Sequence, residues 1–263
     1  MEAMKLAPLH DPSEGPLRVA GLMSGSGTNI RKILEHQGRL TALEGRSPYE
    51  VVVLFTDNAQ SNAVAIGKEY DIPVIVRDLS GFCARHRVSR RDLGAREEFD
   101  RQTVLALSPF GVKVAAYGGY MSIATRPLVE AFLGVNVHPA DLSIENPDGT
   151  RKYVGDHAVR DAIASGEKTV RSSTHIIEPV VDGGRILMIS EPVEVVLEPE
   201  WDLSDPEDLR KAEVFNQERL KKLGDWVIFP RTLEEMARGK FSRDAQGNLY
   251  YAGRPIPKGW RLA

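Results

Sequence analysis

Short apolar runs alternate with helix-like segments over the first two-thirds of this 263-residue chain. The run Val51–Phe55 is apolar throughout, as expected for a strand that is buried on both faces. We predict strands at Leu17–Met23, Val51–Phe55, Val74–Val76, Val112–Tyr117 and Gly134–Val137, and helices at Asn29–His36, Ala63–Tyr70, Arg96–Leu107 and from Thr125 to about Leu133. Strands that are separated by helices pair in parallel. The pattern therefore predicts an α/β fold with a Rossmann-like, mostly parallel sheet and helices on both faces.

The pattern changes after about Arg171. Ser172–Ile177 and Arg185–Val195 are predicted to be longer, antiparallel strands. Ser204 with Glu207 forms a capping box that predicts a helix to about Leu223, and the turn-rich tail after Gly239 predicts a small hairpin around Gly247-Asn248. We therefore expect a loose N-terminal leader at 1–16, followed by two parts of different organisation, the second of which ends in a helix and a hairpin.

Charge and cysteine content exclude several classes of protein. The chain has 34 basic and 37 acidic residues, for a formal net charge of −3, so no nucleic-acid or membrane partner is expected. Cys83 is the only cysteine, so no disulfide can form within the chain, which suits a reducing compartment. No apolar run reaches the ~18 residues of a membrane span, and the N-terminus lacks the apolar core of a signal peptide. We expect a cytoplasmic protein.

A glycine-containing loop joins the first predicted strand to the first predicted helix. It reads Gly25-Ser26-Gly27-Thr28-Asn29, and free N–H groups at a helix start favour a phosphate. A dinucleotide fingerprint would need a third glycine where Ile30 stands, and the Gly-Lys-Ser/Thr ending of a P-loop is missing. A phosphate site and a plain structural turn both remain open.

Asn136 and His138 end the fifth predicted strand. Alternation along a strand places both side chains on the same face, at the edge of the sheet where α/β proteins bind ligands. An amide and an imidazole there can stabilise the charge that a carbonyl oxygen acquires during acyl transfer. The alternative is an ordinary half-buried histidine.

Asp182 precedes Gly183-Gly184 in a loop between the two predicted antiparallel strands. Two glycines indicate close backbone approach, although an aspartate in a turn is also ordinary. Beside an imidazole, the carboxylate would raise the pKa of that imidazole. His157 and His175 are further polar candidates in this part of the chain, but the histidine spacing matches no metal motif, so we expect no metal.

Taken in order, these segments resemble the phosphoribosylglycinamide formyltransferases, a branch of the folate-dependent formyltransferase family. The matching segments are SGSGTN (24–29), AREEFDR (95–101), GGYMSIAT (118–125), GVNVHP (134–139), SSTHIIEPVVDGG (172–184) and GRPIPKGW (253–260). The resemblance covers the chain from about Leu17 to the C-terminus and implies the formyltransferase fold. It implies a Rossmann-like phosphate- and nucleotide-binding half at 17–135, and a catalytic and folate-binding half at 136–263 with the C-terminal helix and hairpin.

The resemblance also implies what the residues do. It implies transfer of a formyl group from 10-formyltetrahydrofolate to a primary amine, most directly that of glycinamide ribonucleotide in purine biosynthesis. The catalytic residues would be Asn136, protonated His138 and Asp182, supported by His157, His175 and Gly183. Gly25, Ser26, Gly27, Thr28 and Asn29 would bind the substrate phosphate, and the folate would contact Arg96, Met121, Ser122, Ile123, Ala124 and Asn136.

The chain departs from the family pattern near the chemistry. Ser122 stands where the family usually has arginine, the loop after Pro139 is longer and more acidic, and Val159 replaces a histidine. A transferase that acts on another amine and a formyltetrahydrofolate hydrolase therefore remain alternatives, as does a nucleotide-binding protein without turnover. Ile30 disfavours an NAD-dependent dehydrogenase. The expected partners are a phosphorylated amine and a folate; a homodimer is left open.

Overall fold

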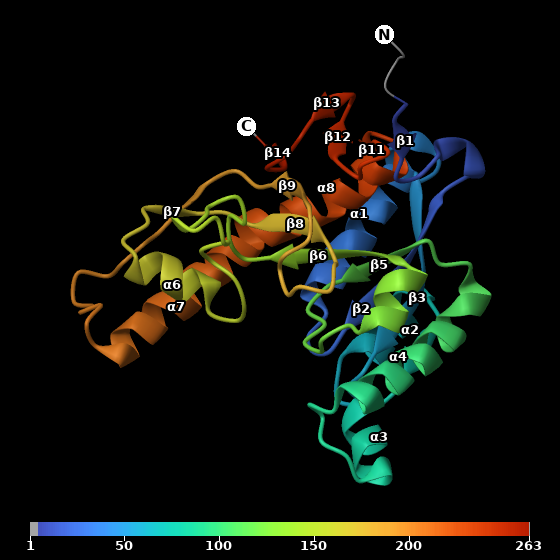
Figure 1. Ribbon diagram of the computed structural model, residues 1–263, viewed down its shortest axis with the longest axis horizontal. Helices are drawn as coiled ribbons and strands as arrows, with labels where there is room; N and C mark the ends of the chain where they lie inside the picture. The colour runs from blue at the N-terminus through green and yellow to red at the C-terminus, as the bar shows by residue number, and fades with distance from the viewer. Residues whose placement is uncertain (1–4, 263) are drawn as a thin grey trace. The chain divides into compact units, whose positions relative to one another are not determined.

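The computed structural model describes residues 5–262 (Figure 1). It divides into two compact units. The N-terminal unit comprises His10–Asn136 with Ile177–Pro179, and the C-terminal unit comprises Val137–Ile176, Val180 onward and the N-terminal residues up to Leu9. The sequence-based leader, 1–16, falls only partly within the described residues: 1–4 lie outside them, and β1 (Ala7–Pro8) pairs with β11 (Phe241–Arg243) of the C-terminal unit.

A parallel sheet forms the centre of the N-terminal unit (Figure 1). Its strand order is β6-β5-β2-β3-β4, and every neighbouring pair is parallel. The strands are β2 (Leu17–Met23), β3 (Tyr49–Thr56), β4 (Val74–Val76), β5 (Val114–Tyr117) and β6 (Leu133–His138). The two units divide within β6, between Asn136 and Val137.

Helices cover both faces of this sheet. They are α1 (Thr28–Glu44), α2 (Ala63–Tyr70), α3 (Leu79–His86), α4 (Leu93–Leu107) and α5 (Arg126–Ala131). On one face, Ile30 of α1 lies against Gly21. A Cβ added to Gly21 would lie 3.2 Å from Cδ1 of Ile30. On the other face, Leu79, Phe99 and Leu128 of α3, α4 and α5 share an apolar cluster with sheet residues that include Ala20 and Leu22. Because consecutive strand residues point to opposite faces, the apolar runs of these strands supply both layers.

The C-terminal unit combines short strands with two longer helices (Figure 1). Here β8 (Ser173–Ile176) pairs antiparallel with β9 (Ile186–Ile189), and β9 pairs parallel with β14 (Trp260–Arg261). The remaining elements are α6 (Ala158–Ala164), β7 (Thr169–Val170), β10 (Val193–Glu194), α7 (Pro206–Leu220), a π-helical turn (Lys221–Asp225), α8 (Trp226–Ala237), β11, β12 (Leu249–Tyr251) and β13 (Arg254–Pro255). Helix α6 packs against α7 through a separate apolar cluster, to which α6 contributes Ala162 and α7 contributes Ala212.

Several sequence predictions are confirmed closely. Three elements have the predicted limits, namely Leu17–Met23, Ala63–Tyr70 and Val74–Val76, and the tail hairpin turns at Gly247-Asn248 as expected. The first helix is longer than predicted, since it continues to Glu44 and ends at Gly45, whose φ of 78° is left-handed.

Other predictions about local structure need correction. The capping residue of α7 is Asp205 and not Ser204: the Asp205 carboxylate accepts hydrogen bonds from the N–H groups of Glu207 and Asp208. Thr125 occupies the cap position of α5, but its side chain makes no capping bond because its hydroxyl donates to Asp100. The predicted strand Arg185–Val195 is two strands, β9 and β10, which pair with β8 and β7 respectively.

Candidate active site and the family it belongs to

The side chain of His138 lies at the end of β6, where it is only 4% exposed. Its Nε2 lies 3.0 Å from the carbonyl oxygen of Tyr153, and its Nδ1 lies 3.5 Å from Oδ2 of Asp182. A carbonyl oxygen can only accept, so Nε2 carries the proton in this contact. Nδ1 then faces a carboxylate at a distance slightly beyond a hydrogen bond.

Asp182 also faces His175. Nε2 of His175 lies 3.5 Å from Oδ1 of Asp182, and the N–H of Gly155 donates to Oδ2 at 2.8 Å. Burial raises the pKa of Asp182, but the His175 side chain, the charge of His138 and the Gly155 N–H together outweigh burial and lower this pKa to about 2. The carboxylate is therefore ionised at neutral pH.

The pKa of His138 moves in the opposite direction to the sequence-based expectation. Asp182 does raise it, but burial of the ring lowers it more, so the pKa of His138 lies below its ordinary value of 6.5. The effect predicted for Asp182 is thus confirmed in direction, but the net pKa of His138 is lowered, which favours the neutral ring over the expected protonated one. The neutral imidazole is favoured because the free energy of desolvating the charged ring exceeds the free energy gained from the ion pair at 3.5 Å.

The backbone around Asp182 is tightly constrained. Asp182 has a left-handed φ of 50°, and the N–H of Gly183 closes a turn onto the carbonyl of Val180 at 3.0 Å. A Cβ on Gly183 would lie 2.7 Å from Cβ of Val180, so glycine is required there and the predicted close approach is confirmed. Arg151 holds the same loop by donating to the carbonyls of Asp182 and Gly184.

The glycine loop of the N-terminal unit leads directly into α1. Gly27 occupies the cap position with a left-handed φ of 69°, and no side chain caps the first turn. A Cβ on Gly27 would lie 2.5 Å from Cε of Met23, whereas Gly25 borders open space. Oδ1 of Asn29 is buried and has no hydrogen-bond partner within the described residues. An uncapped helix start suits an anionic group, whereas the unpaired amide oxygen of Asn29 needs a hydrogen-bond donor.

A second loop of the N-terminal unit, Gly118–Thr125, follows β5. Its side chains Met121 and Ile123 are 71% and 60% exposed. Arg96, by contrast, is 5% exposed and donates to the carbonyl oxygen of Ile123. Burial, with the charges of Asp57 and Asp100, raises the pKa of the neighbouring Tyr120 well above its ordinary value, so its hydroxyl stays neutral.

These arrangements can be compared with known proteins. The sequence pattern described as "Formyl transferase" matches residues 17–202, which is well over half of the chain. The chain belongs to the formyl transferase family. The resemblance stated from the sequence is thereby confirmed, and with it the expected α/β formyltransferase fold.

Individual relatives of this formyl transferase agree with that assignment. It is 27% identical over 215 residues to the phosphoribosylglycinamide formyltransferase of Mycobacterium tuberculosis. The match covers 81% of this chain and 85% of that protein. It is 25% identical over 224 residues to the trifunctional purine biosynthetic protein adenosine-3 of Drosophila melanogaster; the match covers 84% of this chain and 14% of that much longer protein. The solved phosphoribosylglycinamide formyltransferase of Coxiella burnetii shares the fold, with a TM-score of 0.66 and 20% identity over 94% of this chain and all of that one.

The formyl transferase chain uses some residues that sequence reasoning missed. Arg151, the Tyr153 carbonyl and the Gly155 N–H all contact the His138–Asp182 pair, yet they lie in an irregular loop without periodic pattern. Backbone groups of this kind carry no residue-type signal. Arg151, whose side chain reaches a loop 31 residues away, carries no local signal either.

His157, expected to support the site, pairs instead with Glu213 of α7 at 3.0 Å. Its side chain is 56% exposed. Within residues 5–262, no three His, Cys, Asp or Glu side chains are grouped so that they could hold a metal ion, and no helix is long and apolar enough to cross a membrane.

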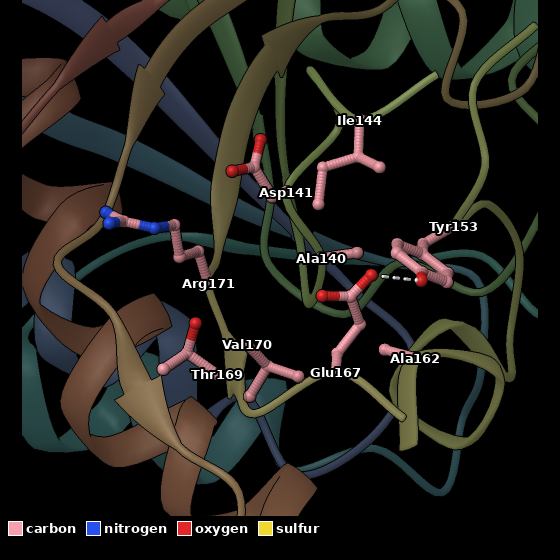
Figure 2. Close-up of a pocket in the computed structure, with 9 residues that line it drawn as sticks. All are labelled: Ala140, Asp141, Ile144, Tyr153, Ala162, Glu167, Thr169, Val170 and Arg171. Atoms are coloured by element: carbon pink, nitrogen blue, oxygen red, sulfur yellow. Dashed lines mark hydrogen bonds between the residues drawn. The ribbon is translucent and has the colours of Figure 1, made fainter. Parts of the chain in front are cut away.

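A cavity of about 60 Å³ in the C-terminal unit borders Tyr153, as Figure 2 shows. The Glu167 carboxylate accepts a hydrogen bond from the Tyr153 hydroxyl at 2.7 Å. The Arg171 side chain extends away from Glu167 and donates to the Ser190 carbonyl. Asp141, on another wall, pairs with Arg261 at 2.9 Å. Because its charged groups are already paired, we assign this cavity no ligand.

Proposed function

We propose that this formyl transferase moves the formyl group of 10-formyltetrahydrofolate to the primary amine of glycinamide ribonucleotide. The observation that carries the proposal is the buried His138–Asp182 pair at the end of β6, two residues after Asn136. The donor supplies an electrophilic formyl carbon and a nitrogen leaving group. The family match and the names of the relatives support this reaction.

The acceptor is proposed to bind through its phosphate at Gly25–Asn29. The helix macrodipole of the 17-residue α1 and its uncapped N–H groups favour an anion there. The buried, unpaired Oδ1 of Asn29 can accept a hydrogen bond from a ribose hydroxyl.

The folate is proposed to lie against the Gly118–Thr125 loop. Met121 and Ile123 are large apolar side chains left exposed, and an aromatic ring system would bury them. Arg96 fits a different role from the direct contact that the resemblance implied: its guanidinium supports the loop from inside through Ile123.

The chemistry follows from the protonation states. Asn136 would donate its amide N–H to the formyl oxygen as negative charge develops there. His138, which is neutral at pH 7, would accept at Nδ1 the proton that the attacking amine loses, because Nε2–H already donates to the Tyr153 carbonyl, and would return it to the departing nitrogen. Asp182, which is ionised, would stabilise the imidazolium while it exists. No net proton is gained or lost by the protein.

The test is a transfer assay with 10-formyltetrahydrofolate and glycinamide ribonucleotide that follows tetrahydrofolate release with and without the acceptor. Acceptor-dependent release is the expected result. Release without the acceptor would mean hydrolysis, and the absence of release would overturn the proposal for this acceptor. Asn136→Ala should lower kcat by about 10²–10³, the usual effect of removing one oxyanion donor. The cytoplasmic location, the homodimer and the lack of a metal stay predictions.

A further inference from the structure

Asp57 follows β3 directly and is only 4% exposed. Its side chain accepts hydrogen bonds from two hydroxyl groups, one at each oxygen. Ser24 donates to Oδ1 at 2.6 Å, and Ser122 donates to Oδ2. These two serines come from segments that are 98 residues apart in the chain, so one carboxylate connects them.

Ser24 immediately precedes the glycine loop and is held on several sides. Its N–H donates to the carbonyl of Gly119 at 3.0 Å, and its hydroxyl accepts from the N–H of Met121 at 2.9 Å. The side-chain amide of Asn58 donates to its carbonyl oxygen at 2.9 Å. The position of Gly25, the next residue, is therefore tied to the Gly118–Thr125 loop.

Polar side chains of the protein interior accept hydrogen bonds from the Gly118–Thr125 loop at Met121, Ser122 and Thr125. Ser24 accepts from Met121, Asp57 accepts from Ser122, and Asp100 accepts from the N–H of Thr125 at 2.6 Å. Because these bonds fix the backbone, the exposed side chains of the loop are presented in a defined arrangement.

A carboxylate that is buried among neutral hydrogen-bond donors has an unfavourable desolvation free energy. Burying an ionised group is strongly unfavourable unless its hydrogen bonds are made, and within the described chain the Asp57 side chain makes only these two. An asparagine would avoid the charge, but it has one acceptor oxygen in place of two, so one of the two bonds would have to reverse, with the amide donating to a serine hydroxyl. The carboxylate is the group that accepts from both serines at once.

We infer that Asp57 is a positioning residue that aligns the acceptor-binding segment Gly25–Asn29 with the donor-binding segment Met121–Ala124. The inference rests on the proposed function, because that function gives the two segments their ligands. Asp57 itself is proposed to touch neither substrate.

Two substitutions separate this role from a general one in stability. Asp57→Asn keeps the size of the side chain but replaces one acceptor oxygen with a donor group, which weakens one of the two bonds, so KM should rise about tenfold for both substrates while kcat changes less than about threefold. Ser122→Ala removes only the bond on the donor side and should raise KM for the folate alone. Ser122→Thr keeps a hydroxyl and should therefore have the folate KM of the wild type. The double variant Asp57→Asn with Ser122→Ala should have the folate KM of Asp57→Asn alone, because both changes break one connection.

Amide hydrogen exchange of the ligand-free protein provides a readout that does not depend on catalysis. The Met121 N–H should exchange at least about tenfold faster in Ser24→Ala, which removes its acceptor, and should exchange faster in Asp57→Asn, where Ser24 is held less firmly. Asp78→Asn is the control for the loss of a negative charge. Asp78 is exposed and lies two residues after β4, where it caps α3 by accepting from the N–H of Ser80, and asparagine caps a helix equally well.

The outcomes distinguish the two proposals. If the wild-type chain transfers no formyl group but the exchange pattern is as expected, the proposed function fails while the Asp57 connection stands. If the wild type is active, and both KM values and the Met121 exchange rate in Asp57→Asn match those of Asp78→Asn, the inference is overturned. A fall in kcat alone would also overturn it, since it would make Asp57 part of the chemistry.

Discussion

The Asp182 carboxylate and the His175 ring lie 3.5 Å apart, Oδ1 to Nε2, while the other oxygen of Asp182 faces His138 at the same distance. His175 is 1% exposed, and its Nδ1 lies 2.9 Å from the carbonyl oxygen of Ile176. The second imidazole helps to keep the pKa of Asp182 low without occupying the oxygen that faces His138. The carboxylate is thus held ionised in a buried position.

Replacing Asp182 by asparagine should remove most of the turnover. The amide keeps the size of the side chain and tolerates the left-handed backbone, but it cannot stabilise the imidazolium of His138. We expect kcat to fall by ~10²–10⁴ in steady-state transfer assays, the range of general acid–base catalysis. Asp161→Asn, on the exposed side of α6 in the same unit, is the control. Wild-type turnover in Asp182→Asn would show that Asp182 has no part in the reaction.

The titration of His138 should reflect the burial of its ring. Burial lowers its pKa below 6.5, so the basic form that accepts a proton persists below that pH. In the ligand-free protein, where no acceptor amine titrates, the His138 ring should therefore titrate with a midpoint below pH 6.5. Nuclear magnetic resonance of the ring protons as a function of pH measures this midpoint. A midpoint above pH 6.5 would mean that the charge of Asp182 prevails over burial.

Acid stability should depend on Asp182. Its pKa is lowered on folding to about 2, so the unfolded chain binds the proton first as the pH falls. The stabilisation is fully present above the ordinary carboxyl pKa of ~3.9 and is lost as the pH falls through about 2. The free energy of unfolding of the wild type, relative to Asp182→Asn, should be constant above about pH 5 and decrease towards pH 2. Urea titrations across this range measure it, and a difference that does not change with pH would refute the ion-pair assignment.

Gly27 and Gly25 should respond differently to alanine. At Gly27 a methyl group meets Met23 and Ile66 at 2.5 and 2.6 Å, and the backbone has a left-handed φ of 69°. Gly27→Ala should lower the free energy of unfolding by about 1–3 kcal/mol. Gly25→Ala adds a methyl group in open space and should change stability by less than about 0.5 kcal/mol. Thermal unfolding of both variants compares them, and equal effects would mean that the steric environment of Gly27 is not limiting.

Burial on both faces explains which elements were predictable. The strands β2 and β3 are largely buried apolar runs, and in an α/β chain a run of that kind usually forms an interior strand. The edge strand β4 is also apolar, although its residues are half-buried or exposed. Helix α8 escaped prediction because it contains Pro230, which interrupts the helical sequence signal. Helix α3 is absent from the sequence-based prediction, although Asp78 caps its start.

The sequence by itself determined the order of strands and helices, the family, and the candidate residues Asn136, His138 and Asp182, because these depend on residue types at short spacing. Only the tertiary structure decided how His138 is charged, since burial is a property of everything packed around the ring. It alone also revealed that Arg151 holds the Asp182 loop and that Asp57 connects Ser24 with Ser122. Contacts between distant segments leave no local pattern, because the partners are brought together by the packing of the whole chain and not by their spacing along it.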